Sequence, residues 1–354
     1  MKHLPKIDGL RAIAVVGVLV SHYLPKDHGI QLLPWGILGV QLFFVISGFL
    51  ITGILLDARD KASDSTVLKA FYARRFLRII PPYYLLLGLY LLAGLKFEPG
   101  TLTASFLYYL NIFQAVNPGS YLYLGHFWTL CIEEQFYLIW PWVIIFLPRS
   151  KLVGFTILAI IFAPISRMLL DLTGFSYVAV RNLPTSALDS LAGGALLALM
   201  HHGHAPRLFA WWRRNYGWVM LAGIFLYAWT RFLPNYSPEH LWVGLLGTSL
   251  SGMAAVHYAT LNYNTFADRV LNNSFLRYIG KISYGIYLYQ FLTLYPLYKI
   301  ISMLGHPPLL SNVYIFAIVW TVLTVITASL SWYCFEKPLL SLKRRFNYNP
   351  HSTR

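Results

Sequence analysis

The stretch GLRAIAVVGVLVSHY, Gly9 to Tyr23, decides the fold of this chain: it is apolar enough to enter a bilayer, yet it carries Arg11 and His22. On a helix these two residues are separated by eleven steps, about 16 Å along the axis and roughly 20° around it. They therefore share one face. Because ionisable side chains are costly in lipid, we expect a first membrane span whose polar face is turned into a helix bundle.

Each of the two residues also has a simpler interpretation. Arg11 could be a cytoplasmic anchor whose long side chain reaches the membrane surface. His22 could lie at the opposite interface and touch lipid headgroups. Spacing alone leaves both alternatives open.

Composition places the whole chain in a membrane. Of its 354 residues, 57% are hydrophobic and only 12% are charged, whereas soluble domains are about one quarter charged. The formal charge of +15 is expected to reflect cytoplasmic loops rich in Lys and Arg, so nucleic acid is not an expected partner. Cys131 and Cys334 lie in apolar runs and indicate neither a disulfide framework nor a metal site. We expect no bound metal.

The hydropathy pattern predicts an all-α integral membrane protein, a bundle of about ten transmembrane helices. The segment 101–115 is short for a span, and we interpret it as an outer re-entrant or interfacial stretch. With this topology and a cytoplasmic N-terminus, 22 of the 28 Lys and Arg residues fall on the inner side, which places both termini in the cytoplasm. The expected spans are roughly 8–24, 34–56, 77–95, 127–147, 152–170, 186–201, 216–233, 241–261, 280–303 and 312–335.

Three arginines gather at the predicted inner mouth of the third span, in FYARRFLRIIPPYYL. Arg75 and Arg78 share a helix face, and Arg74 precedes them. Guanidinium groups suit phosphate because they form planar, bidentate hydrogen bonds. We therefore expect a dock for phosphate or pyrophosphate. Ordinary positive-inside anchoring remains the alternative.

Two adjacent carboxylates, Glu133 and Glu134, lie in the fourth span, within HFWTLCIEEQFYLIWPW, and His126 stands at its outer start. At least one carboxylate should face the interior, where it could pair with Arg11, orient His22 or hold a substrate hydroxyl. A structural ion pair that locks the bundle is the alternative.

Aromatic and amide groups are candidates for substrate binding. Trp128 belongs to an outer aromatic stretch that could stack on a sugar ring or form an interfacial belt. In KISYGIYLYQ, Tyr284 and Gln290 are expected along one cavity wall. His126 completes this set of candidates.

Taken together, these segments resemble the integral-membrane acyltransferase-3 family, bacterial enzymes that O-acylate glycans, lipid-linked sugars and related acceptors. The likeness covers nearly the whole chain. In this family a basic residue is followed, after ten intervening residues, by a histidine. The corresponding residues here are Arg11 and His22, and the family's Arg-x-x-Arg corresponds to Arg75 and Arg78. Its Trp-Ser-Leu-x-x-Glu-x-Gln-Phe-Tyr segment corresponds to Trp128, Thr129, Leu130, Glu133, Gln135, Phe136 and Tyr137.

This chain departs from the family pattern at two positions: Thr129 replaces a serine, and Gln290 stands where many members have a histidine. An acid–base role at position 290 is therefore doubtful, but a hydrogen-bonding role remains. Some relatives carry a C-terminal SGNH domain. Here we expect a stand-alone form, with a membrane domain over 1–340 and a cytoplasmic basic tail over 341–354.

The resemblance implies a multi-pass O-acetyltransferase of the bacterial cytoplasmic (inner) membrane. Acyl-CoA, expected to be acetyl-CoA, would dock on Arg74, Arg75 and Arg78, and His22 would act as general base on a hydroxyl of a glycan or lipid-linked sugar. Surface polysaccharides, such as lipopolysaccharide or exopolysaccharide, are the expected acceptors, and membrane lipids surround the protein. Glu133 or Glu134 would orient His22, and Arg11 would hold the donor or pair with a carboxylate.

A second hypothesis belongs to another class. A proton-coupled transporter or exporter could use the same buried His, Arg and Glu residues as a relay. No internal repeat supports it.

Overall fold

The computed structural model describes residues 4–25, 28–117, 119, 121–232, 239–261, 263–303, 305 and 312–348, and in these ranges every regular element is helical. This confirms the all-α class. The longer helices are α1 (Pro5–Tyr23), α2 (Trp35–Arg59), α3 (Asp64–Leu92), α6 (Trp128–Phe146), α7 (Arg149–Leu172), α9 (Leu188–His201), α10 (Pro206–Phe232), α11 (Glu239–Ala259) and α17 (Val313–Ser331). The shorter helices are α4 (Thr101–Phe106), α5 (Leu110–Val116), α8 (Tyr177–Asn182), α12 (Phe266–Leu271), α13 (Ser274–Lys281), α14 (Ser283–Tyr289), α15 (Leu294–Met303) and α18 (Lys337–Ser341).

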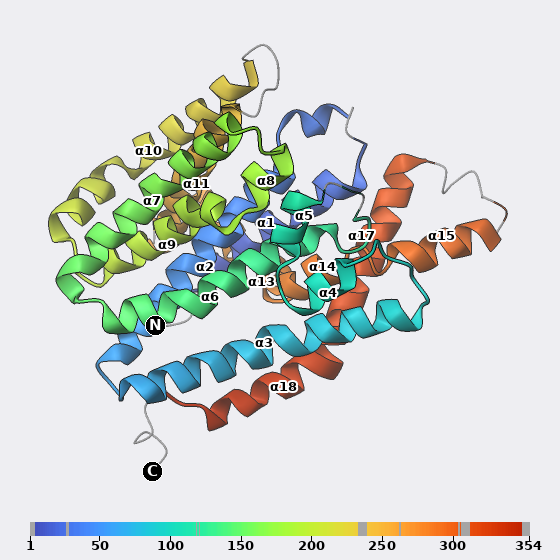
Figure 1. Cartoon of the computed structure of the whole chain (residues 1–354), viewed down its shortest axis with the longest axis horizontal. Coiled ribbons are helices and arrows are strands. Elements are labelled where there is room, and N and C mark those ends of the chain that lie inside the picture. The colour runs from blue at the N-terminus through green and yellow to red at the C-terminus, as the bar shows by residue number, and fades with distance from the viewer. Residues whose placement is uncertain are drawn as a thin grey trace.

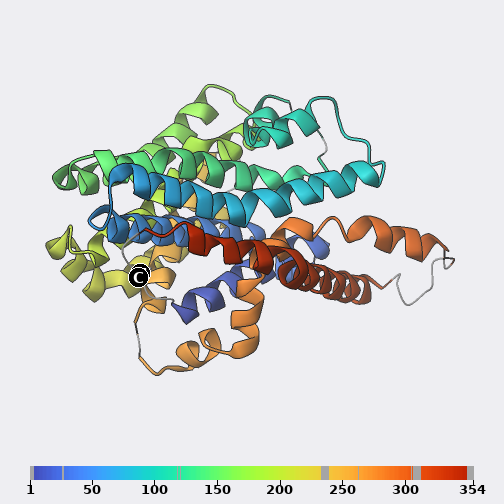
Figure 2. The same cartoon turned by 90° about the horizontal axis from the view of Figure 1, so that it is seen from below.

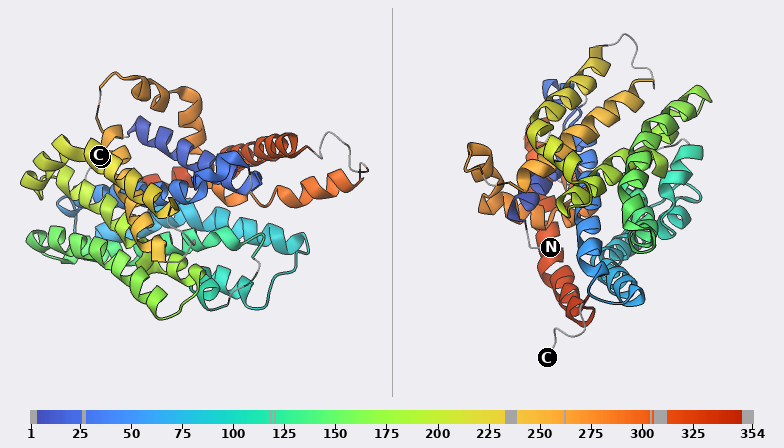
Figure 3. Two further views of the ribbon diagram at one scale, coloured as in Figure 1. Left: turned by 90° about the horizontal axis from the view of Figure 1, so that it is seen from above. Right: turned by 90° about the vertical axis from the view of Figure 1, so that its left-hand side faces the viewer.

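The helices form one elongated bundle. Helices α7, α9, α10 and α11 gather at one end, and α14, α15 and α17 lie toward the other (Figures 1 and 3). Helix α3 runs along one side of the molecule with α18 beside it (Figures 1 and 2).

Within the described residues, five helical segments are long and apolar enough to cross a membrane, and the chain is a multi-pass membrane protein. They are 35–59, 64–92, 125–146, 149–172 and 313–345. The expected count of ten spans and the cytoplasmic position of both termini stay predictions.

Helix α1 is turned as the spacing of Arg11 and His22 predicts. Ile13 and Val16, on the opposite face, are 45% and 46% exposed, as side chains facing lipid would be. The start of the helix is fixed by an ion pair of 2.6 Å between Lys6 Nζ and Asp268 Oδ1 at α12. The polar face of α1 therefore points into the bundle.

Helix α9 falls within the expected span 186–201 and is the shortest of the longer helices. It has 14 residues, which rise about 21 Å, less than the ~30 Å hydrocarbon core of a bilayer. Its small residues instead allow close packing on α2: a Cβ at Gly194 would lie 2.0 Å from the carbonyl oxygen of Val45, and one at Gly48 would lie 1.9 Å from that of Leu191. Helix α9 is thus buried in the bundle and packs closely against α2.

The predicted span 280–303 is wrong as a single helix, because the chain breaks between α14 and α15. The carbonyl oxygen of Gln290, freed by the break, accepts hydrogen bonds from Trp320 Nε1 at 2.7 Å and Thr293 Oγ1 at 3.1 Å. Side chains thus satisfy backbone groups that a continuous helix would have paired. The break leaves the Gln290 side chain inside the bundle.

The segment 101–115 contains only the short helices α4 and α5, of six and seven residues. Each rises about 10 Å, far less than a membrane crossing requires. This agrees with the prediction that the segment is not a span, while its side of the membrane stays a prediction.

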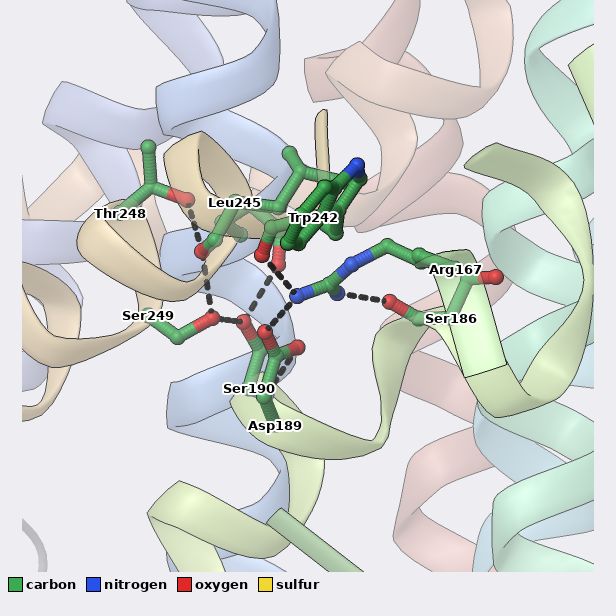
Figure 4. A network of polar contacts seen from close by, with 9 residues as sticks. Arg167, Ser186, Asp189, Ser190, Trp242, Leu245, Thr248 and Ser249 are labelled. Carbon is green, nitrogen blue, oxygen red and sulfur yellow. Dashed lines mark hydrogen bonds and ion pairs between the residues drawn. The ribbon is translucent and has the colours of Figure 1, made fainter. Parts of the chain in front are cut away.

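A buried ion pair joins α7, α9 and α11 (Figure 4). Arg167 is fully buried, and its Nη2 lies 2.7 Å from Asp189 Oδ2 and 3.0 Å from the carbonyl oxygen of Trp242. Its Nη1 donates to the carbonyl oxygen of Ser186 at 2.6 Å. Ser190, next to Asp189, donates a hydrogen bond to Gln41, so the network also reaches α2.

Candidate active site

Most of the predicted site residues line one of two cavities in the described part of the bundle. The first, which we call the arginine cavity, has a volume of about 200 Å³. Helices α1, α3 and α6 contribute its ionisable lining residues: Arg11, Arg75, Arg78, Glu133, Glu134, Tyr137 and, from α14, Tyr284.

The arginine cavity has an excess of positive charge, three guanidinium groups against two carboxylates. Glu133 Oε1 accepts a hydrogen bond of 2.5 Å from Ser47 Oγ and interacts electrostatically with Arg11. Arg75 lies 5.4 Å from the ring of Tyr137. Among the described residues Glu134 Oε1 has no hydrogen-bond partner. Glu133 and Arg11 thus line the same cavity and attract each other electrostatically, and donors remain for an anionic ligand.

Arg74 does not line this cavity. Its Nη1 donates to the carbonyl oxygen of Phe346 at 3.0 Å, and its guanidinium lies 5.2 Å from the ring of Tyr348. The segment that follows α18 thus packs on Arg74 at the side of α3. Of the three arginines, only Arg75 and Arg78 face the cavity.

The second cavity, which we call the histidine cavity, has a volume of about 500 Å³. Its lining includes His22, His126 and Trp128, which were predicted from the sequence as site residues, together with Arg181 at the end of α8. His22 is exposed because it lines this space. The interior position predicted for it is thus a cavity with polar lining residues, which explains how the ring is tolerated in a membrane helix.

His22 is oriented by an amide rather than by a carboxylate. Its Nδ1 lies 2.8 Å from Gln290 Oε1, and Gln290 Nε2 donates to the carbonyl oxygen of Tyr287 at 3.0 Å. Because the NH₂ group of Gln290 donates to the carbonyl oxygen of Tyr287, it is Oε1 of Gln290 that faces the imidazole. Nδ1 then carries the proton, and Nε2 is left as the basic nitrogen.

The expectation that Glu133 or Glu134 orients His22 is therefore wrong. Both carboxylates line the arginine cavity, while His22 lines the other. The hydrogen-bonding role expected for Gln290 is present, and it is the role that had been assigned to a glutamate.

The two cavities meet at Val40 on α2 and Tyr287 on α14, which line both. The hydroxyl of Tyr287 donates to the carbonyl oxygen of His126 at 2.8 Å and lies 2.6 Å from Thr129 Oγ1. Val40 and Tyr287 thus lie between the guanidinium groups and the imidazole.

The remaining candidates take different positions. His126 is buried, with Nε2 3.4 Å from the carbonyl oxygen of Leu288, and no described residue bonds its Nδ1. Tyr284 donates to the carbonyl oxygen of Ile79 at 2.9 Å in the arginine cavity, away from the predicted sugar site. The ring of Trp128 lies 5.0 Å from the guanidinium of Arg181.

Sequence reasoning missed Arg181, Val40 and a set of buried amides. Asn182 Nδ2 donates to Gln114 Oε1 at 2.9 Å, and Asn111 Nδ2 bonds both Gln135 Oε1 and the carbonyl oxygen of Asn182. The only available signal was polar amides within apolar segments, such as NIFQ at 111–114. Val40 carried no signal.

Comparison with known proteins gives a family for this architecture. An acyltransferase domain, that of the acyltransferase-3 family, matches residues 4–336, and the chain belongs to this family. The peptidoglycan O-acetyltransferase OatA of Listeria monocytogenes is 31% identical over 318 residues, which cover 82% of this chain and 49% of that protein. No solved structure shows a significant match.

Two further relatives agree. A Staphylococcus aureus protein provisionally named an O-acetyltransferase is 30% identical, with 100% of this chain and 61% of that protein covered. YrhL of Bacillus subtilis, provisionally named a peptidoglycan O-acetyltransferase, is 28% identical over 96% of this chain and 55% of its own length. The chain thus spans about half to three fifths of the curated relatives it matches.

Proposed function

We propose that this protein is a membrane O-acetyltransferase that moves an acetyl group from acetyl-CoA to a hydroxyl of a glycan, with His22 as general base. One observation carries the proposal: a cavity rich in guanidinium groups and a cavity that holds an oriented imidazole meet at Val40 and Tyr287. Membership of the acyltransferase family and the names of the relatives support the reaction class.

The donor would enter from the arginine side. Arg75 and Arg78 would bind phosphate oxygens, and Arg11, which lines the same cavity as Glu133, would line the path of the pantetheine arm. A volume of about 200 Å³ is smaller than pockets that enclose drug-sized ligands. Only the acylated end of acetyl-CoA would therefore fit within it, with the nucleotide at the mouth. The proposed side of the membrane for the donor is the cytoplasm.

The chemical step follows from the tautomer of His22. Nε2 accepts the proton of the acceptor hydroxyl while its oxygen attacks the thioester carbonyl. The new C–O ester bond forms as the C–S bond breaks, and the CoA thiolate leaves and takes up the proton from His22. Gln290, which accepts from Nδ1–H, keeps Nε2 aimed and stabilises the transient imidazolium.

For the acceptor, the names of two relatives favour peptidoglycan over the lipopolysaccharide or exopolysaccharide that we first expected. The histidine cavity would hold the sugar that bears the reacting hydroxyl, on the outer side of the membrane. Its volume of about 500 Å³ falls within the range of small-molecule sites.

The test is a transfer assay with purified protein in nanodiscs, acetyl-CoA labelled with ¹⁴C in the acetyl group, and peptidoglycan fragments as acceptors. Wild-type protein should form an alkali-labile acetyl ester and release free CoA. His22→Ala should lower the rate by about 100-fold or more, the contribution of general base catalysis. A folded His22→Ala protein with the wild-type rate would refute the proposal.

A further inference from the structure

Arg181 is a cation for which the mechanism above has no use. It lies at the end of α8 and lines the histidine cavity together with His22, close enough to interact electrostatically with that imidazole. The described residues that line this cavity include no Asp or Glu. The space in which the acceptor would bind is therefore positively charged.

The guanidinium of Arg181 is held in place without a counter-ion. Its plane lies against two rings, 5.0 Å from the Trp128 centroid and 5.5 Å from the Tyr177 centroid. Its Nε donates to Asn182 Oδ1 at 2.9 Å. An arginine has five N–H donors, and in the described part of the chain no hydrogen bond uses the four on the terminal nitrogens. These four form the fork that grips carboxylate and phosphate.

The support of Arg181 is itself rigid. Asn182 is buried, its Nδ2 donates to Gln114 Oε1 at 2.9 Å, and Gln114 Nε2 donates to the carbonyl oxygen of Gly125 at 3.1 Å. This chain of amides ties α8 to α5 and to the segment before α6. A fork held by packing and amide bonds is preorganised, and such a group loses little conformational entropy when it binds an anion.

Trp128 gains a role from the same contact. One face of its indole is covered by the Arg181 guanidinium, so this face is not free for a sugar ring. Trp128 therefore acts as a platform that positions Arg181.

We infer that Arg181 is an acceptor-binding residue, and that the acceptor carries an anionic group, carboxylate or phosphate, close to the hydroxyl that is acetylated. The inference rests on the proposed function and names the substrate class within it. A neutral sugar would leave the fork unpaired, whereas an anionic sugar would place its hydroxyl between Arg181 and His22. A single charge-assisted hydrogen bond is worth roughly 10- to 100-fold in binding, so a fork that forms two should give a preference of at least about tenfold.

The experiment compares matched acceptors with the purified full chain at saturating acetyl-CoA. The carboxylate arm uses N-acetylmuramic acid and its neutral methyl ester. The phosphate arm uses N-acetylglucosamine 1-phosphate and neutral methyl N-acetylglucosaminide. The wild type should show kcat/KM at least tenfold higher for the charged member of one pair, and the pair with the larger ratio identifies the anion.

Arg181→Gln should bring that ratio close to one, and Arg181→Lys should restore it in part. Lys96→Gln is the matched control: it removes one exposed positive charge that does not line the cavity, and it should keep the wild-type ratio. Calorimetric binding of the same acceptors, without donor, provides a readout that does not depend on turnover.

The outcomes separate the two proposals. If wild-type protein acetylates or binds the charged and neutral members equally, or if Arg181→Gln keeps the preference, the inference is overturned and the transferase proposal stands. If no acetyl ester forms with any acceptor while the charge preference persists in binding, the inference stands and the proposed reaction fails.

Discussion

The Nδ1 atom of His22 on α1 lies 2.8 Å from Oε1 of Gln290, a residue 268 positions further along the chain. Gln290 stands at the break between α14 and α15, where its carbonyl oxygen is held by Trp320 and its amide nitrogen by Tyr287. The side chain is thus fixed at both ends before it meets the imidazole. This contact assigns the proton of His22 to Nδ1.

Loss of the acceptor atom at position 290 should impair catalysis. Gln290→Met keeps the length of the side chain but cannot accept strongly from Nδ1–H, so the orientation of the ring is no longer fixed. We expect kcat to fall roughly 10- to 100-fold, as happens when partners that orient histidines in metal sites are removed. Gln290→Glu, which keeps an acceptor oxygen, should retain more activity. Equal rates for the two variants in the acetyl-transfer assay would contradict the orienting role.

The arginines of α3 should not contribute equally to donor binding. Arg75→Gln combined with Arg78→Gln removes two guanidinium groups from the arginine cavity, and KM for acetyl-CoA should rise about tenfold or more. Arg74→Gln should produce a smaller rise, because Arg74 lies outside the lining and bonds the carbonyl of Phe346. Initial rates over a range of acetyl-CoA concentrations measure both. An unchanged KM for acetyl-CoA in the double variant would contradict the proposed binding of donor phosphates by Arg75 and Arg78.

The junction of the two cavities can be blocked sterically. Val40→Phe should fill the space beside Tyr287, because packed interiors leave little room for added volume. Acetyl transfer should fall at least about tenfold, while binding of acetyl-CoA measured by calorimetry persists. Val40→Ala, which leaves the junction open, is the matched control. Full transfer activity in the Val40→Phe protein would mean that the acetyl group does not pass this point.

The Arg167–Asp189 pair should be structural. Asp189→Leu alone leaves a buried guanidinium without its counter-ion and should destabilise the protein by about 3–5 kcal/mol. Adding Arg167→Met removes the unpaired charge and should recover much of that loss. Thermal unfolding in detergent measures both. If the double variant unfolds no later than Asp189→Leu, unpaired charge is not the cause of the instability.

Local chemistry explains why some features could be predicted from the sequence. The shared face of Arg11 and His22 follows from helix geometry alone, and the exposed Ile13 and Val16 confirm it. The sequence also indicated that a carboxylate of α6 would face the interior near Arg11, because buried charges require partners. The break at Gln290 was missed, since that segment is as apolar as a true span.

By itself, the sequence determined that this is an all-helical membrane protein, that one face of the first helix is polar, and which side chains carry chemistry, because each of these depends on composition or on residues a few turns apart. Only the tertiary structure decided how those side chains combine. In the folded protein His22 contacts Gln290 and not a glutamate, Arg74 lies outside the arginine cavity, and Arg181 lines the histidine cavity. The physical reason is that contacts between distant segments depend on how whole helices pack and where they break, and short-range periodicity carries no record of that packing.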